Sequence, residues 1–204
     1  MRGELLLKGL AFGFLLAATV GPMWVLCLRR TLAGGALVGL ASGLGIAAAD
    51  GFYGAVAAFG LTAISGFLLA HAFWIGLLGA AFLIYLGLRT LFAPTQIEEK
   101  DEAPLSLSAA LLSTLGLTLA NPPTILAFAA IFAGLGLAAS ADYTAAALIT
   151  LAVFAGSASW WVVLAAAGGA LRERLGPRLQ RVINLVSGVT ILGFAAWQFA
   201  LLLR

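Results

Sequence analysis

Residues Leu105 to Ser140 read LSLSAALLSTLGLTLANPPTILAFAAIFAGLGLAAS and contain no charged side chain. In soluble domains about a quarter of the residues are charged, whereas this chain of 204 residues is 9% charged and 63% hydrophobic. Such stretches have few groups that prefer water to hydrocarbon, so lipid must cover much of the protein surface. The sequence therefore predicts an all-α integral membrane protein.

Six stretches are apolar over the roughly 20 residues that a helix needs to cross a bilayer. These are Leu5–Leu28, Leu37–Ile64, Phe67–Phe92, Leu105–Leu137, Tyr143–Ala170 and Val182–Leu203. Short turns separate them, including Arg29–Thr31 and the basic loop Arg172–Arg181, and the segment 93–104 is the longest polar one. We expect one transmembrane domain, 1–204, with half-repeats 1–92 and 105–204 joined by a polar cytoplasmic loop at 93–104.

The distribution of basic residues predicts the orientation, because positively charged loops stay in the cytoplasm. The first, third and fifth loops hold most of the Lys and Arg residues, namely Arg29, Arg30, Arg89, Lys100, Arg172, Arg174, Arg178 and Arg181. The other side has Arg2, Lys8 and Arg204. Both termini are therefore expected outside. Three spans per half also permit an inverted 3+3 repeat, since the second half would enter the membrane in the opposite direction.

Two spans carry residues that break helices. Gly21-Pro22 stands late in the first span, and Asn121-Pro122-Pro123 stands at the matching position of the fourth. Proline leaves a backbone carbonyl unpaired, and within the bilayer such a group needs protein, water or ligand as its partner. Matched broken helices are typical of transporter binding sites, where freed amides attract a carboxylate and freed carbonyls a cation. The alternative is a pair of packed kinks.

Asp50 is the one ionisable residue near the middle of a predicted span. A charged side chain at the bilayer centre costs about 2.5–3.5 kcal/mol on insertion scales. Such a residue is a candidate proton carrier, or a counter-ion for the amine of a substrate. The alternative is a neutral acid that only hydrogen-bonds a neighbouring helix.

Further polar residues lie at helical spacing from these features. Tyr53 follows Asp50 by one turn, and Thr118 precedes Asn121 by three residues. The substrate-binding residues that we expect are Gly21, Pro22, Asp50, Tyr53, Thr118, Asn121 and Pro122, with Asp50 also coupling to protons. The aromatic residues Phe73, Trp74, Trp160, Trp161 and Trp197 are interpreted as interfacial anchors or packing rather than a binding cage.

Other classes of function lack their sequence signatures. The chain has no phosphate-binding loop, dinucleotide fingerprint or Cys/His metal cluster. We therefore expect no cofactor, no metal site and no enzymatic activity, and a transporter of this kind would use an ion gradient. The basic residues are too scattered to indicate nucleic acid, and the single Cys27 excludes an internal disulfide. Small residues at every fourth position, Gly9, Gly13, Ala17 and Gly21, allow close helix contact, either within the chain or in a homodimer.

Taken together, these motifs resemble the lysine exporter (LysE) superfamily of translocators, including its homoserine/threonine (RhtB) branch. The similarity lies in Val20-Gly21-Pro22, in Gly39 to Gly45 followed by Asp50, in Gly76 to Arg89, and in Asn121-Pro122. Many members have Pro-Gly-Pro where this chain has Val20-Gly21-Pro22, and a basic residue often follows Asn-Pro where Pro123 stands here.

The resemblance implies a bacterial inner-membrane exporter of amino acids or related small metabolites, driven by the proton gradient and surrounded by lipid. It also leaves open a family topology of five spans with one re-entrant segment. Two other functions stay open from the sequence. One is export of a metal or other small cation, and the other is a non-transport membrane assembly or electron-transfer subunit.

Overall fold

The computed structural model describes residues 2–59, 67, 70–92, 105–121, 124, 128, 143–172 and 176–202. Within these ranges the chain is helical and has no strands, as the composition predicts. The helices are α1 (Arg2–Ala18), α2 (Pro22–Gly34), α3 (Ala36–Ala58), α5 (Ala72–Leu91), α6 (Leu107–Leu119), α8 (Tyr143–Arg172) and α9 (Pro177–Leu202).

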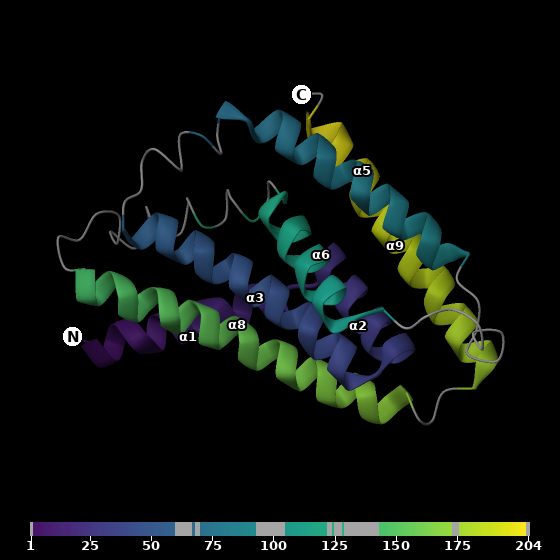
Figure 1. Cartoon of the computed structure of the whole chain (residues 1–204), viewed down its shortest axis with the longest axis horizontal. Coiled ribbons are helices and arrows are strands. Elements are labelled where there is room, and N and C mark those ends of the chain that lie inside the picture. The colour runs from purple at the N-terminus through teal and green to yellow at the C-terminus, as the bar shows by residue number, and fades with distance from the viewer. Residues whose placement is uncertain are drawn as a thin grey trace.

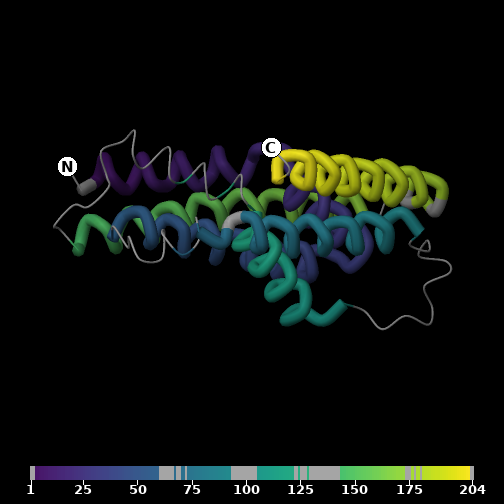
Figure 2. Tube along the Cα trace, turned by 90° about the horizontal axis from the view of Figure 1, so that it is seen from above, coloured from purple at the N-terminus to yellow at the C-terminus, as the bar shows by residue number. Residues whose placement is uncertain are grey.

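The helices form two groups with α2 between them (Figure 1). In the first group, α1 packs along α8, α8 along α3, and α3 along α6. In the second, α5 and α9 run side by side. Viewed from above, α1 and α9 occupy the same layer of the elongated molecule, roughly end to end (Figure 2). The short helix α2 contacts α3, α8 and α9, so it connects the two groups.

Four helices of the described chain are long and apolar enough to cross a membrane, or five if the bent pair α1 and α2 counts as one span. The predicted multi-pass membrane protein is thus confirmed, whereas the count of six spans is not reached. Much of the fourth predicted span, Leu105–Leu137, lies outside the described residues. Its described helix, α6, has 13 residues, too few to span the roughly 30 Å of hydrocarbon alone.

The first span is broken where the sequence predicts it. The helix α1 ends at Ala18, α2 begins at Pro22, and their axes differ by 74°. Gly21 caps α2 in an extended conformation, and Pro22 takes the first helical position, where its missing N–H removes no helical hydrogen bond.

The predicted turn at Arg29–Thr31 is wrong, because all three residues are helical and α2 continues to Gly34. The chain reverses at Gly35 instead, with a φ of 90° that favours glycine. Arg30 is buried, and its guanidinium donates to the Ala110 carbonyl at 3.1 Å. Arg30, which indicated a loop in the sequence, therefore helps to hold α2 against α6.

Glycines let α1 and α8 approach closely. A Cβ atom at Gly13 would collide with the Val153 carbonyl oxygen, and one at Gly156 would collide with the Leu10 carbonyl oxygen. Close backbone approach of this kind is how small residues associate helices in membranes. The predicted stripe of small residues thus meets α8 of the same chain along Gly9 and Gly13.

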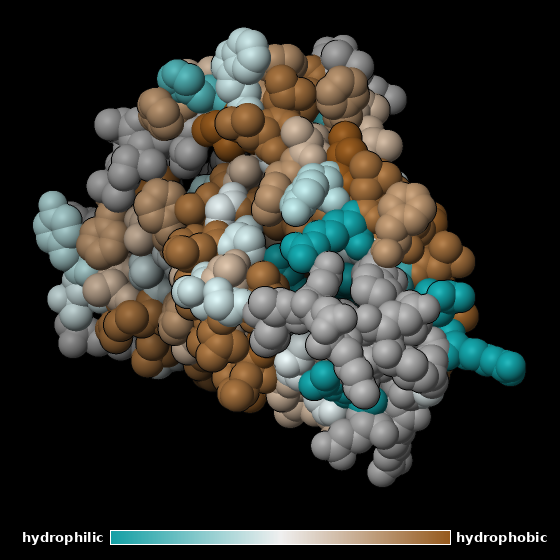
Figure 3. Space-filling view, turned by 45° about the vertical axis from the view of Figure 1, so that its right-hand side comes forward, coloured by the Kyte–Doolittle hydropathy of each residue, from teal (hydrophilic) through white to brown (hydrophobic). Residues whose placement is uncertain are grey.

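The outer surface of the described chain is rich in large apolar side chains, as lipid contact requires. Leu78 is 72% exposed and Leu7 is 69% exposed. In the view of Figure 3, hydrophobic side chains cover most of the described surface. By contrast, Cys27 is fully buried, with its sulfur 3.4 Å from the Gly39 carbonyl oxygen.

Candidate functional site

A cavity of about 330 Å³ lies beside the break in the first span. The end of α1 and the start of α2 form one wall, from Leu16 to Trp24. The opposite walls come from α3, α6, α8 and α9, so both helix groups contribute. Its volume is at the low end of the roughly 300–1,000 Å³ typical of small-molecule sites.

Asp50 is the one charged side chain among the described residues that line this cavity. It is 3% exposed, and its Oδ2 accepts a hydrogen bond of 2.7 Å from the Ser157 hydroxyl. Ser157 in turn accepts from the Trp161 Nε1–H at 3.2 Å. This chain of contacts holds the carboxylate in place from α8. Within the described part of the protein, no basic side chain hydrogen-bonds or ion-pairs with Asp50.

Neutral polar groups also line the cavity. Two of them, the hydroxyl of Thr118 and the Nε1–H of Trp24, are buried without a hydrogen-bond partner among the described residues. The Gln198 amide instead donates to the Gly76 carbonyl at 2.9 Å and so ties α9 to α5. Buried groups without partners are rare in native structures, so Thr118 and Trp24 are available to a ligand or to water.

The start of α2 adds backbone donors to the same wall. The first N–H groups of a helix have no partner within it, and Met23 and Trp24 hold these positions after Pro22. The aligned peptide dipoles make this end of the helix partly positive. The wall formed by α2 therefore favours a negatively charged group.

The structure brings together most of the residues that the sequence singled out. Five of the seven line the cavity, namely Gly21, Pro22, Asp50, Thr118 and Asn121. Tyr53 does not line it. Its hydroxyl donates to the Leu119 carbonyl at 2.6 Å, and so it fastens α3 to the end of α6. Pro122 lies outside the described residues.

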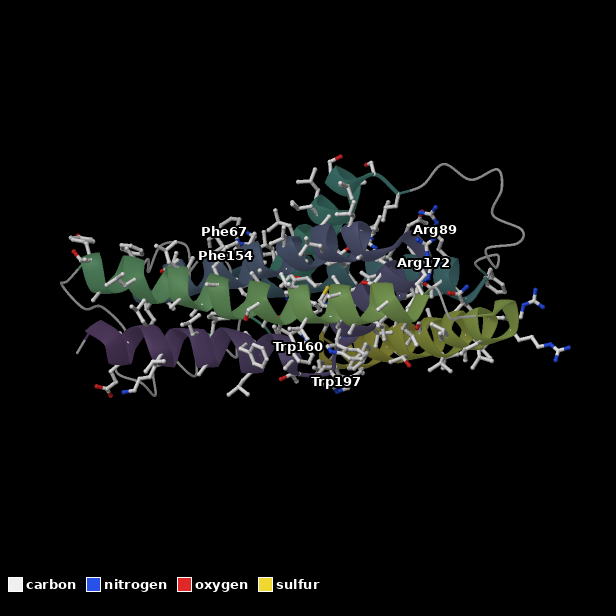
Figure 4. All side chains as sticks on the ribbon, turned by 90° about the horizontal axis from the view of Figure 1, so that it is seen from below. Phe67, Arg89, Phe154, Trp160, Arg172 and Trp197 are labelled. Carbon is white, nitrogen blue, oxygen red and sulfur yellow. The ribbon has the colours of Figure 1, made fainter. Side chains whose placement is uncertain are left out.

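Several lining residues were missed from the sequence. Trp24, Trp161, Phe194 and Trp197 give the cavity aromatic walls, although Trp161 and Trp197 were interpreted as anchors or packing. Trp161 is buried, and Trp197 lies near the middle of the long axis (Figure 4). The spacing of Ser157 and Trp161, one helical turn apart, is the signal that could have placed both on one face of α8.

The family model described as LysE type translocator matches residues 14–201, which is nearly the whole chain. The chain belongs to the LysE type translocator family. No match was found among curated proteins or among solved structures.

Membership of this family makes the protein a translocator that exports small molecules across a membrane. Residues 14–201 include every described residue that lines the cavity. No group of three or more His, Cys, Asp or Glu side chains that could hold a metal ion occurs in the part of this translocator that the structure describes.

Proposed function

We propose that this translocator is a secondary active exporter of amino acids or related small metabolites, which exchanges its substrate for protons across the bacterial inner membrane. The observation that carries the proposal is the buried carboxylate of Asp50 in a cavity at the break of the first span. Intramembrane acids of this kind mark substrate and proton pathways in transporters.

The polar groups of the cavity suit the two ends of an amino acid. The Asp50 carboxylate would engage the ammonium group, and the positive end of α2 with the Trp24 N–H would engage the carboxylate. Gly21, Pro22 and the neutral side chains of Thr118 and Asn121 would shape the pocket between them. Pro122 is retained as a proposed site residue on the sequence pattern, and Tyr53 would position the helices around the site.

Exchange then follows from competition for one carboxylate. A proton that binds Asp50 removes the charge that holds the ammonium group, so it favours substrate release. Loss of that proton restores the binding form. Because the two helix groups both line the cavity, a movement of α5 and α9 against the other helices could open it to either side.

Efflux from proteoliposomes tests the proposed function. Vesicles containing the purified protein are loaded with labelled amino acids, and release is compared with and without a pH gradient. We expect release to accelerate when the external solution is more acidic than the lumen. Protein-free vesicles give the background, and release at that background rate for every amino acid would refute the proposal.

The proposed orientation has six crossings, an inverted 3+3 repeat and both termini outside. Arg89 and Arg172 stand in the last turns of α5 and α8 and lie on the same side of the middle of the long axis (Figure 4), which supports a cytoplasmic position for these helix ends. We expect topology reporters at Lys100 and after Gly176 to be cytoplasmic, and a reporter at the C-terminus to be external. A cytoplasmic C-terminus would instead support five crossings and would remove the basis of the inverted repeat.

A further inference from the structure

The residues that line the cavity indicate which kind of substrate side chain fits it. Among the described lining residues, Asp50 alone bears a charge. The remaining wall is largely aliphatic or aromatic, with Leu16, Val20, Ile46 and Phe194 among its members. A ligand that satisfies Asp50 and the donors of α2 therefore has an apolar wall against the rest of its surface.

We propose that the site selects amino acids with bulky apolar side chains over those with charged side chains. This inference rests on the proposed function and narrows its substrate class. The ammonium group binds Asp50, and the side chain lies against the apolar wall. A lysine or arginine side chain would bring a second positive charge, for which the described wall offers no carboxylate. A glutamate side chain would add a negative charge without a basic partner.

The aromatic walls support the same assignment. Trp161 is almost completely buried, and its indole N–H donates a hydrogen bond to Ser157. Its ring therefore presents an apolar surface to the cavity. Trp24, Phe194 and Trp197 add further aromatic surface. Large aromatic rings contribute much of the binding of apolar groups. Small side chains such as that of alanine would leave part of the cavity of about 330 Å³ unfilled.

Discrimination against a hydroxyl is expected to be weaker than discrimination against a charge. Apolar pockets reject an isostere that merely adds a hydroxyl by about 100-fold at most. Threonine should therefore be a poor substrate rather than an excluded one. Lysine should be the sharper contrast, because it equals norleucine with one added ammonium group.

The test is competition in proteoliposomes that exchange labelled leucine. Norleucine and lysine are the matched pair of competitors, since their side chains have the same number of carbons. We expect norleucine to compete at concentrations more than about 100-fold lower than lysine, and threonine to fall between them. Equal competition by lysine and norleucine, or exchange of labelled lysine without leucine, would overturn the inference and leave the proposed function standing. If the vesicles exchange no amino acid, both this inference and the proposed function are refuted.

A substitution in the wall tests the physical reason for the selectivity. Phe194→Asp places a second carboxylate in the wall that α9 contributes, so we expect it to raise competition by lysine at least tenfold relative to norleucine. Phe194→Asn is the matched control, because it is polar and of equal size but uncharged, and we expect it to give no gain for lysine. An equal gain in both variants would show that charge does not set the preference. If Phe194→Asp fails to fold, the competition between norleucine and lysine in the wild-type protein still tests the inference.

Discussion

Asp50→Asn will abolish gradient-driven efflux while the protein reaches the membrane at normal levels. Asparagine has nearly the shape of aspartate and can still accept the hydrogen bond from Ser157, but it cannot ionise. A hydrogen bond to a charged group contributes roughly 1.5–3 kcal/mol, so loss of the charge alone should weaken binding of an amine about 10- to 100-fold. Loss of the proton site removes the coupling as well.

Two further variants separate the charge of Asp50 from its placement. Asp50→Glu keeps the charge on a longer side chain, and we expect it to retain part of the efflux. Ser157→Ala removes the hydrogen bond of 2.7 Å but leaves the carboxylate, so it should reduce efflux by about tenfold, which is less than the loss expected in Asp50→Asn. Rates are measured in loaded vesicles under an imposed pH gradient and normalised to protein amount. Wild-type rates in Asp50→Asn with unchanged pH dependence would leave Asp50 a purely structural role.

Gly156→Ala will strongly destabilise the protein. The added Cβ would collide with the backbone of Leu10, which cannot move aside as a flexible side chain could. Overpacking typically lowers the free energy of unfolding by about 1–3 kcal/mol. For a collision with backbone we expect the upper end of this range, about 3 kcal/mol. For a chain of this size we expect the midpoint of thermal unfolding in detergent to fall by about 6–12 °C.

Gly193→Ala is the matched control for that substitution. Gly193 lies in α9, and a Cβ atom there would meet nothing within 4 Å. Alanine is favoured over glycine in a helix by about 1 kcal/mol, so this variant should be as stable as the wild type or more stable. The same chemical change should thus have opposite signs at the two glycines. A small effect at both would show that α1 and α8 do not pack at this contact.

The fold class and the break in the first span could be predicted because both depend on local sequence. Hydrophobic length indicates a membrane helix, and Gly21-Pro22 is unfavourable in the interior of a helix. The end of α2 could not be predicted in this way. Arg30 resembles a loop residue in sequence, but its guanidinium donates to Ala110, which is 80 residues away along the chain. Only tertiary contact makes that arginine acceptable inside a helix bundle.

The candidate site shows the same division between local and distant signals. Asp50 stands out because an acid is rare in a membrane span. Its partner Ser157 does not stand out, because serine is an ordinary packing residue in such helices and lies 107 positions further along the chain. The aromatic lining residues were missed for a related reason. A tryptophan in a span indicates an anchor, a packing residue or a ligand wall equally well until its neighbours are known.

The burial of Cys27 makes the native protein suitable for labelling at introduced cysteines. It is the sole cysteine of the sequence, and the packing around it leaves none of its surface exposed. Alkylating reagents require an accessible thiolate, so the native chain should stay unlabelled while folded. Spectroscopic labels can then be attached to cysteines introduced on either helix group without first removing a native thiol. Pairs of such labels, one on each helix group, would measure how far the groups move apart when a substrate or a pH gradient is added.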